Sequence, residues 1–415
     1  MHTARSVARL LAALLMLWLS IAPARAEGYA VPIGGALSYE NDEVWSRLVK
    51  LAGGRDARFV VFGTASEDPR KASERIVATL RKHGAQAEFI PLSAPSPGRP
   101  VADEQLTRQW SAQVSRATGV YFAGGAQERI TSALLPQGRP TPVLDAIWGV
   151  YRKGGVVAGS SAGAAIMSEV MFRDAQDVLM VMKNGMRDGK EIDRGLGFVG
   201  PGLFIDQHFL RRGRVGRMIP LMQSKGIEHG IGVEEDSAAI IHGRKVGVIG
   251  SKGAVLVDLT QSERDSAMAA FNVRHARLHY LESGDAVDLD TMQVAPSPAK
   301  RSGALLDPAA PDFAPYYDRG AFYPDFLGDG TLAAAMARLL DSRATEVRGL
   351  AFGAPGEQTG PANLGFEFRL YKGAGTRGWL STASGSEAYT VTGVYLDIVP
   401  VKLAEPLYSP WRGGR

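Results

Sequence analysis

The chain has 415 residues, of which 45% are hydrophobic and 22% are charged, as in ordinary globular proteins. Its 47 Lys and Arg residues against 43 Asp and Glu give a formal net charge of +4, and aromatic residues make up 8%. This balance provides neither the basic surface nor the aromatic platform that nucleic-acid binding needs, so we expect no nucleic-acid partner. The chain has no cysteine, which excludes disulfides and every mechanism with a cysteine nucleophile.

Residues 1–26 are typical of a secretory signal peptide. Two arginines precede the apolar run from Leu10 to Ile21, and Ala24-Arg25-Ala26 provides a cleavage site of small residues. The run is shorter than the roughly 20 apolar residues that a membrane span needs. We therefore expect export to the periplasm or the cell exterior, cleavage before Glu27, and no membrane association after cleavage. An uncleaved short anchor is the alternative.

From Tyr29 to about Asp258, short apolar or β-branched runs alternate with helical stretches, which favours a mainly parallel sheet flanked by helices. The predicted strands are Gly28–Ile33, Arg58–Gly63, Glu88–Pro91, Gly119–Ala123, Gly155–Gly159 and Leu203–His208. The predicted helices are Asn41–Leu51, Asp68–Lys82, Asp103–Ala117 and Ala162–Val170. Together these elements indicate a three-layer α/β domain.

The second half of the chain has more strands than helices. A hairpin-like edge is predicted from Gly230–Glu235, Ala238–His242 and Val246–Ile249, followed by one or two closing strands in Arg274–Leu289. Prolines between residues 295 and 315 predict a connector without a regular ladder. Beyond it we expect a helix at Thr331–Arg343 and strands at Phe366–Tyr371 and Tyr389–Val401. The predicted division is a signal peptide (1–26), a main domain (27–294), and the connector with a β-rich accessory region (295–415).

The strongest local motif is the segment from Gly155 to Ala165, in which Gly159-Ser160-Ser161-Ala162-Gly163 carries the pattern G-x-S-x-G. A strand enters a helix through this pattern, and the small residues allow neighbouring backbone to approach a strained turn. Ser161 is therefore a candidate nucleophile. In a chain with 49 glycines the pattern alone is weak, and a serine that only caps the helix is the alternative.

A serine nucleophile needs a base, and His208 is the best candidate among seven histidines. It ends a predicted strand at its carboxyl end, where α/β sheets bind their ligands. His275 and His279 alternate with Arg277 on a strand face that we expect to be solvated. Because no third ligand accompanies this pair, we expect no metal site.

The third member of such a site is a carboxylate that faces the imidazole. Alternation along Gly230–Asp236 places Glu235 on the core side, whereas Glu234 and Asp236 fit a solvated turn. Asp206 is the competing candidate. The resulting chain order of serine, histidine and acid differs from the order serine, acid and histidine of α/β-hydrolases, which argues against an esterase of that class.

Four segments resemble, in the same order, the motifs of the cyanophycinases, a serine peptidase family that also contains aspartyl dipeptidase. They are Gly124-Gly125-Ala126-Gln127-Glu128-Arg129-Ile130, the elbow at Ser161, Asp206-Gln207-His208-Phe209 with the arginines that follow, and Gly230-Ile-Gly-Val-Glu-Glu235. The resemblance covers residues 29 to about 290 and implies a flavodoxin-like fold of the class I glutamine amidotransferase kind. Ser160 and Ala126 depart from it, since threonine and asparagine are common at these positions.

The resemblance implies a hydrolase that cuts cyanophycin, a polyaspartate with arginine on each β-carboxyl, into β-aspartyl-arginine dipeptides. Ser161 would be the nucleophile, His208 the general base and Glu235 its partner, with no metal or cofactor. The substrate pocket would be lined by Gln127, Asp206, Gln207, Arg212, Arg214 and Arg217, although solvated-face roles for Arg214 and Arg217 are equally compatible with their helical spacing.

The backbone N–H groups of Gly125 and Ala162 are the predicted oxyanion hole. A homodimer is expected from the family alone. Two other functions remain open from the sequence. One is a dipeptidase that acts on small aspartyl or isoaspartyl peptides, and the other is a non-catalytic member of the fold that binds a polymer.

Overall fold

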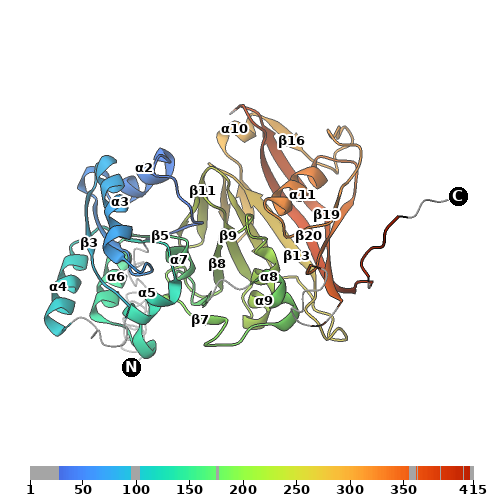
Figure 1. Cartoon of the computed structure of the whole chain (residues 1–415). Coiled ribbons are helices and arrows are strands. Elements are labelled where there is room, and N and C mark those ends of the chain that lie inside the picture. The colour runs from blue at the N-terminus through green and yellow to red at the C-terminus, as the bar shows by residue number, and fades with distance from the viewer. Residues whose placement is uncertain are drawn as a thin grey trace, which may run out of the picture.

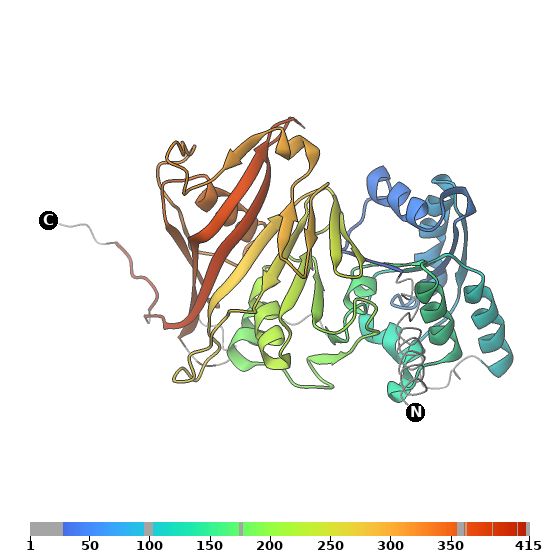
Figure 2. The ribbon, with the colours of Figure 1, turned by 180° about the vertical axis from the view of Figure 1, so that it is seen from behind.

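The computed structural model describes residues 28–94, 103–173, 177–354, 361, 363–383, 385–404 and 406–411. The predicted signal peptide lies outside these residues. Two large sheets stand next to each other, with helices packed on both (Figures 1 and 2). In the described part of the chain, no helix has the length and apolar character that crossing a membrane requires.

The first sheet contains the predicted parallel core. Its strand order is β15-β14-β11-β10-β1-β5-β4-β2-β3, and the last five strands are mutually parallel. These five strands are β1 (Tyr29–Ile33), β5 (Val156–Ser160), β4 (Gly119–Phe122), β2 (Arg58–Phe62) and β3 (Gln86–Ile90). Each matches a predicted strand to within two residues. β1, β4 and β5 are almost continuously apolar and buried, as expected inside a parallel sheet, whereas β3 lies at the edge and exposes Gln86 and Glu88.

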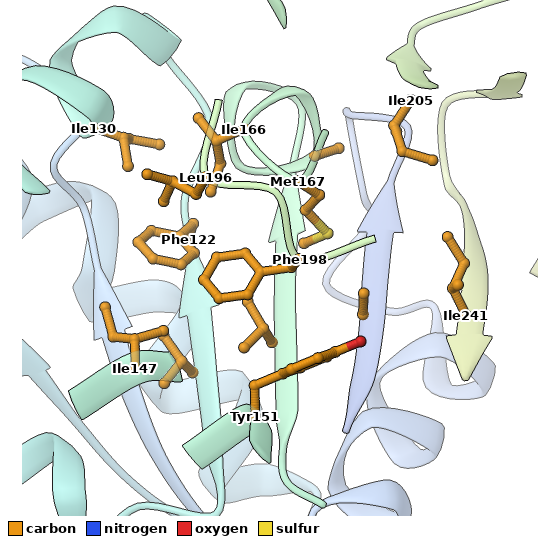
Figure 3. Close-up of a cluster of buried hydrophobic side chains, with 14 of the residues drawn as sticks. Phe122, Ile130, Ile147, Tyr151, Ile166, Met167, Leu196, Phe198, Ile205 and Ile241 are labelled. Carbon is orange, nitrogen blue, oxygen red and sulfur yellow. The ribbon is translucent and has the colours of Figure 1, made fainter. Parts of the chain in front are cut away.

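Helices cover both faces of this parallel core, which confirms the three-layer α/β prediction. On one face lie α2 (Asp42–Leu51) and α3 (Pro69–Lys82), and on the other lie α4 (Glu104–Ser115), α5 (Gln127–Leu134), α6 (Pro142–Arg152) and α7 (Ala162–Ala165). Short 3₁₀ turns occur at Gly54–Asp56 and Pro136–Gly138. Figure 3 shows the second helical layer meeting the sheet, where Phe122, Ile147, Tyr151 and Phe198 converge.

Capping residues explain where several of these helices begin. The side chains of Asn41, Asp68, Asp103 and Thr141 each accept a hydrogen bond from a backbone N–H in the first turn of the following helix. Pro69 and Pro142 occupy the first helical position, where a missing N–H costs nothing. α5 and α6 are not among the helices predicted from the sequence, although Thr141-Pro142 is a clear signal for the start of α6.

The predicted helix Ala162–Val170 is wrong in length, because α7 ends at Ala165. The carbonyls of Ile166, Met167 and Ser168 accept hydrogen bonds from backbone N–H groups of residues 196–199 instead of continuing the helix. The chain then forms a separate two-stranded sheet from β6 (Val170–Phe172) and β7 (Ile192–Arg194).

Four antiparallel strands extend the first sheet beyond β1. They are β10 (Ser237–His242), β11 (Lys245–Gly250), β14 (Ala286–Asp288) and β15 (Gln293–Ala295). The predicted hairpin is present, because β10 and β11 pair across the turn at Gly243 and Arg244. Its predicted position at an edge is wrong, because β10 also pairs with β1 and β11 with β14. The buried run Ala238–Ile241 explains this position, since a strand buried on both faces belongs inside a sheet.

The second sheet has the order β17-β18-β19-β20-β13-β12-β9-β8. Its strands are β8 (Leu203–Gln207), β9 (His229–Val233), β12 (Ala254–Asp258), β13 (Val273–Leu281), β17 (Phe322–Tyr323), β18 (Glu346–Ala351), β19 (Leu364–Ser381) and β20 (Ala388–Lys402). We predicted β8 in the parallel core, and this is wrong. β10 occupies the free edge of β1, so β8 pairs with β9 instead.

One hydrophobic core holds the second sheet together across the predicted boundary at residue 295. Residues such as Met218 and Leu278 cluster with Met336 and Phe366 from the C-terminal region, and β13 pairs directly with β20. Three helices supply side chains to this core, α8 (Val178–Asn184), α9 (Val215–Lys225) and α11 (Thr331–Leu340). The division of the chain at 294 and 295 stays a prediction, and strands from both sides of it share this sheet.

The predicted connector contains regular structure, so the expectation of none there is wrong. Residues 298–301 form α10 (Pro298–Arg301), and β16 (Ala304–Leu306) pairs with β19. Pro298 is the first helical residue and Ser297 accepts a hydrogen bond from the N–H of Lys300, so this proline starts a helix instead of preventing one.

Candidate active site

Ser161 follows β5 in a strained backbone conformation, with φ 54° and ψ −108°. Its backbone N–H donates to the carbonyl of Ile33 at the end of β1 (3.0 Å), which fixes the turn between two neighbouring strands. A side chain at Gly163 would overlap the carbonyl oxygen of Phe122, and one at Gly159 would overlap the backbone of Gly163. The glycines of the motif are therefore required by close backbone packing, as the elbow interpretation predicts.

His208 follows β8, also with a positive φ of 47°. Its backbone N–H donates to the carbonyl of Gly34 in the loop after β1 (2.7 Å). Gly35 has φ 110°, and a Cβ at this position would overlap the imidazole of His208. Gly34 and Gly35 are not among the predicted site residues, although two consecutive glycines directly after a strand are a visible signal for close packing.

The three predicted residues lie in hydrogen-bonding contact. Ser161 Oγ is 2.9 Å from His208 Nε2, and His208 Nδ1 is 2.7 Å from Glu235 Oε1. With the proton on Nδ1, the neutral imidazole donates to the carboxylate and accepts from the serine hydroxyl. This is the arrangement by which a serine is activated as a nucleophile.

Burial is the largest influence on the pKa of His208. It lowers the pKa of His208, and the charges of Arg212 and Arg214 lower it further, while the hydrogen bond to Glu235 raises it. Burial also favours the neutral form of Glu235. The hydrogen bond and charge of His208 and the charge of Arg211 outweigh this effect and leave the pKa of Glu235 below its usual value. At neutral pH the site therefore contains a neutral imidazole beside an ionised carboxylate.

The competing acid, Asp206, is engaged elsewhere. Its Oδ2 accepts from Arg217 Nε at 2.8 Å, and its Oδ1 accepts from a terminal nitrogen of the same guanidinium. The pair is buried, with Asp206 2% and Arg217 1% exposed. Asp206 therefore does not orient His208.

Glu234 is buried, so the prediction of a solvated turn is wrong for this residue, whereas Asp236 is partly exposed. β9 ends at Val233, and strand alternation does not extend to the acids. Glu234 is 2% exposed and accepts hydrogen bonds from the backbone N–H groups of Leu210 and Arg211, just after His208. Asp236 Oδ1 accepts from the N–H of Ser38 and the amide of Asn41, after β1. Glu234 therefore holds the loop after β8, and Asp236 holds the loop after β1, next to Glu235.

Most of the predicted pocket residues are buried in one polar network. Arg214 donates to the backbone carbonyl and the side-chain oxygen of Gln207, and its guanidinium lies 3.4 Å from Asp206 Oδ1. Gln127 donates to the carbonyl of Phe172 at 2.6 Å. These contacts hold the end of β8, from which His208 projects.

Arg212 differs from the other predicted pocket residues because it is exposed. Its charge acts on His208, which places its guanidinium in the neighbourhood of the imidazole. No described residue accepts a hydrogen bond from its side chain or forms an ion pair with it. A direct role in substrate binding stays a prediction for the whole set Gln127, Asp206, Gln207, Arg212, Arg214 and Arg217.

The predicted oxyanion hole lies beside the serine. A Cβ at Gly124 would be 3.9 Å from Ser161 Oγ, so this backbone passes directly along the Ser161 side chain. Gly125 is exposed with φ 143°, and the N–H of Ala126 donates to the carbonyl of Ala65, which anchors the turn. Within the described residues, the N–H groups of Gly125 and Ala162 have no acceptor and are free to bind a developing oxyanion.

The C-terminal region contacts the loop that follows His208. The N–H of Gly330 donates to the carbonyl of Leu210 (3.2 Å), and Arg211 forms an ion pair with Asp329 (3.0 Å). The Nε of Arg211 is also 3.8 Å from Glu235 Oε2. The segment before α11 thus lies against the loop that follows His208, a contact that the sequence did not predict.

Among the residues that the structure describes, no three histidine or acidic side chains lie close enough together to bind a metal ion. The chemistry that this arrangement supports is nucleophilic attack by a serine, with a histidine base and backbone donors. An α/β fold with such a site defines a serine hydrolase.

Comparison with known proteins agrees with this class. Residues 33–249 match the model of Peptidase family S51. The chain therefore belongs to peptidase family S51 and is a serine-type peptidase.

Several relatives have been described as cyanophycinases. The protein from Synechococcus elongatus is 28% identical over 276 residues, which cover 65% of this chain and 81% of that protein. The protein from Geminocystis herdmanii (strain PCC 6308) is 27% identical over 270 residues, covering 63% and 93%. A solved structure of a peptidase from an acI-B1 Actinobacterium aligns with a TM-score of 0.45 and 15% identity, over 64% of this chain and 98% of that one.

Proposed function

We propose that this protein is an exported serine exopeptidase that hydrolyses cyanophycin to β-aspartyl-arginine dipeptides through an acyl-enzyme. The observation that carries the proposal is the continuous contact from Ser161 through His208 to Glu235. The cyanophycinase relatives supply the substrate class. The predicted signal peptide supplies the expectation of export.

In the proposed reaction, His208 Nε2 takes the proton of Ser161 as Oγ attacks a backbone aspartyl carbonyl. The N–H groups of Gly125 and Ala162 stabilise the negative oxygen of the tetrahedral intermediate. His208 then protonates the leaving amine, and the acyl-enzyme forms. Water attacks the acyl carbon, its proton passes to His208 and then to Ser161, and the carboxylate product leaves.

The charges around the site suit an anionic group on the substrate. Arg212 is exposed near His208, and Arg211 is about half exposed beside Glu235. A guanidinium binds a carboxylate through paired hydrogen bonds, so Arg212 is our candidate for the free carboxylate of a terminal aspartyl unit. The buried pair Asp206–Arg217 would not contact the substrate but would hold the end of β8, which His208 follows.

The direct test is clearing of insoluble cyanophycin granules by the purified mature protein, with the products identified by mass spectrometry. Clearing with release of β-aspartyl-arginine supports the proposal, and the Ser161→Ala variant is the matched control. A serine-reactive phosphonate probe should label Ser161 in the same preparation.

Two outcomes would point to the alternatives. An enzyme that the probe labels but that leaves granules intact and cleaves small aspartyl or isoaspartyl peptides is a dipeptidase. A folded protein that neither reacts with the probe nor cleaves any of these substrates is a polymer-binding member of the fold.

Export is tested separately from catalysis. The proposal predicts that the protein accumulates outside the cytoplasm and that its N-terminal residue is Glu27. Cell fractionation with intact-mass analysis checks both, and a cytoplasmic protein that retains residues 1–26 would contradict export without affecting the peptidase proposal.

A further inference from the structure

Two strands away from β9 in the second sheet, β13 carries a polar cluster that the peptidase reaction does not use. Arg277 and His279 lie on one face of this strand, while Ala276, Leu278 and Tyr280 on the opposite face enter the core beneath α11. We predicted that this polar face is solvated. For His279 the prediction is wrong, because the residue is 1% exposed.

His279 is buried without any partner in the described structure. Neither ring nitrogen has a hydrogen-bond acceptor or donor within reach, and Arg277 Nε is buried and unpaired in the same way. Buried polar atoms are normally paired, so atoms left open in a folded protein call for a ligand or ordered solvent. Burial lowers the pKa of His279 to about 4, so the ring is neutral at neutral pH and offers one donor and one acceptor.

These side chains line a cavity of about 270 Å³ between the two sheets. One wall comes from β13 and the long strands β19 and β20, which contribute Arg377, Trp379 and Thr392. The opposite wall is Met292, Gln293 and Val294, from the β14–β15 hairpin of the first sheet. The cavity is smaller than most sites for drug-sized ligands, which limits its occupant to a small molecule.

The strands around the cavity are irregular at this place. The register of β13 against β20 shifts between Leu278 and Tyr280, and the register of β19 against β20 shifts between Lys372 and Arg377. Gly393 has φ 67°, and a Cβ there would be 3.3 Å from a terminal nitrogen of Arg277, so glycine leaves room for the guanidinium. Bulges of this kind redirect side chains and are frequent next to binding sites.

The charges that face the cavity are mainly positive. Neither Arg277 nor Arg377 forms an ion pair with any described residue. Asp258 is near enough to raise the pKa of His279, but its Oδ1 accepts from both the N–H and the hydroxyl of Thr260. The Thr392 hydroxyl donates to the carbonyl of Arg377. The free groups are therefore two guanidinium groups and a neutral imidazole.

We propose that this cavity is a binding site for a small oxyanion, a carboxylate or a phosphate, held by Arg277, Arg377 and His279. Arg277 would bind the oxyanion inside the cavity, and the exposed Arg377 would close its mouth. The N–H of the neutral His279 ring would donate one further hydrogen bond to an oxygen of the oxyanion. The site is independent of the proposed peptidase function.

The experiment is calorimetric titration of the full mature protein with sodium succinate and, separately, with sodium phosphate at constant ionic strength. We expect saturable binding of at least one probe. The affinity should fall at least about tenfold in Arg377→Gln and in Arg277→Gln, since each removes a charged hydrogen bond. Arg348→Gln is the matched control, because Arg348 is an exposed arginine of β18 in the same sheet and pairs with Glu346 and Glu367.

Binding of succinate alone identifies a carboxylate site, and binding of phosphate alone identifies a phosphate site. No binding of either probe, or equal binding by Arg377→Gln and Arg348→Gln, overturns the proposal. Arg377 is exposed, so we expect Arg377→Gln to fold. This variant therefore still tests the site if Arg277→Gln does not fold. A crystal structure of the protein soaked in the stronger probe should show it in contact with Arg277 and His279, and ordered water alone there would also overturn the proposal.

Discussion

Ser161 and His208 are 2.9 Å apart, although they follow strands of two different sheets. Ser161 follows β5 in the first sheet, and His208 follows β8 in the second. The loop after β1 joins them, because Ile33 accepts from the N–H of Ser161 and Gly34 accepts from the N–H of His208. The contact between Ser161 and His208 therefore depends on how the two sheets meet.

Replacing Ser161 with alanine should lower kcat at least about 10⁴-fold, because the nucleophile is lost and only binding and the backbone donors remain. The substitution removes one hydroxyl, so the melting temperature should stay close to that of the wild type. Steady-state turnover and circular dichroism check the two expectations. Ser160→Ala, one residue earlier, is the control and should retain most of the activity; an active Ser161→Ala enzyme would exclude Ser161 as nucleophile.

The acid limb of the kcat/KM profile should lie below pH 6.5, the ordinary pKa of histidine. Burial lowers the pKa of His208, and only the neutral ring accepts the serine proton, so activity rises as pH increases through that lowered pKa. Glu235→Gln removes the negative charge and replaces a charged hydrogen bond by a weaker neutral one, and both the charge and the hydrogen bond of Glu235 raise the pKa of His208. In that variant the acid limb should move to still lower pH. kcat should also fall strongly, because the tautomer of the imidazole is no longer fixed. An acid limb above pH 6.5 would contradict this description of the site.

Gly35→Ala should impair catalysis more than folding. The new Cβ would overlap the imidazole of His208, and a displacement of about 1 Å can cost 10²-fold in rate. Gly84→Ala is the matched control, since Gly84 also has a positive φ (95°) but a Cβ there would meet no heavy atom within 4 Å. Both variants carry backbone strain, and only Gly35→Ala should lose turnover and probe labelling. Equal loss of activity in the two would assign the effect to strain alone.

Asp206→Asn should destabilise the fold by about 3–5 kcal/mol, because it leaves the buried guanidinium of Arg217 without its charged partner. Glu104→Gln removes an exposed i,i+4 pair with Arg108 and should cost less than about 1 kcal/mol. Chemical denaturation of both variants measures the difference. A change of similar size in the two would show that the buried pair does not hold the end of β8.

Asp329→Asn should change the pH profile with little effect on stability. Its pair with Arg211 is exposed, so the loss in unfolding free energy should be under about 1 kcal/mol. Arg211 would then have only Glu235 as a charged partner. The charge of Arg211 would offset more of the negative charge of Glu235, which raises the pKa of His208, so this pKa should fall and the acid limb should move to lower pH. Asp318→Asn, which removes another exposed pair of the C-terminal region, is the control and should leave the profile unchanged.

The sequence alone determined the parallel core and the identity of the three central side chains. Buried parallel strands are recognisable as apolar runs, and the elbow at Ser161 depends on local glycines that only close packing explains. His208 and Glu235 were predicted from their places at the ends of strands, and both contact the expected partner. Strand alternation does not place Glu235, however, since β9 ends two residues before it.

Only the tertiary structure decided which strands pair over long distances. β10 pairs with the edge of β1, so β8 is not in the first sheet and pairs with β9 in the second. In the same second sheet, the C-terminal strand β20 pairs with β13. The apolar pattern of β10 and β8 fits either position, so local sequence cannot choose between them. The burial of Glu234 and His279 has the same cause, because each is covered by segments far away in the chain whose approach depends on these pairings.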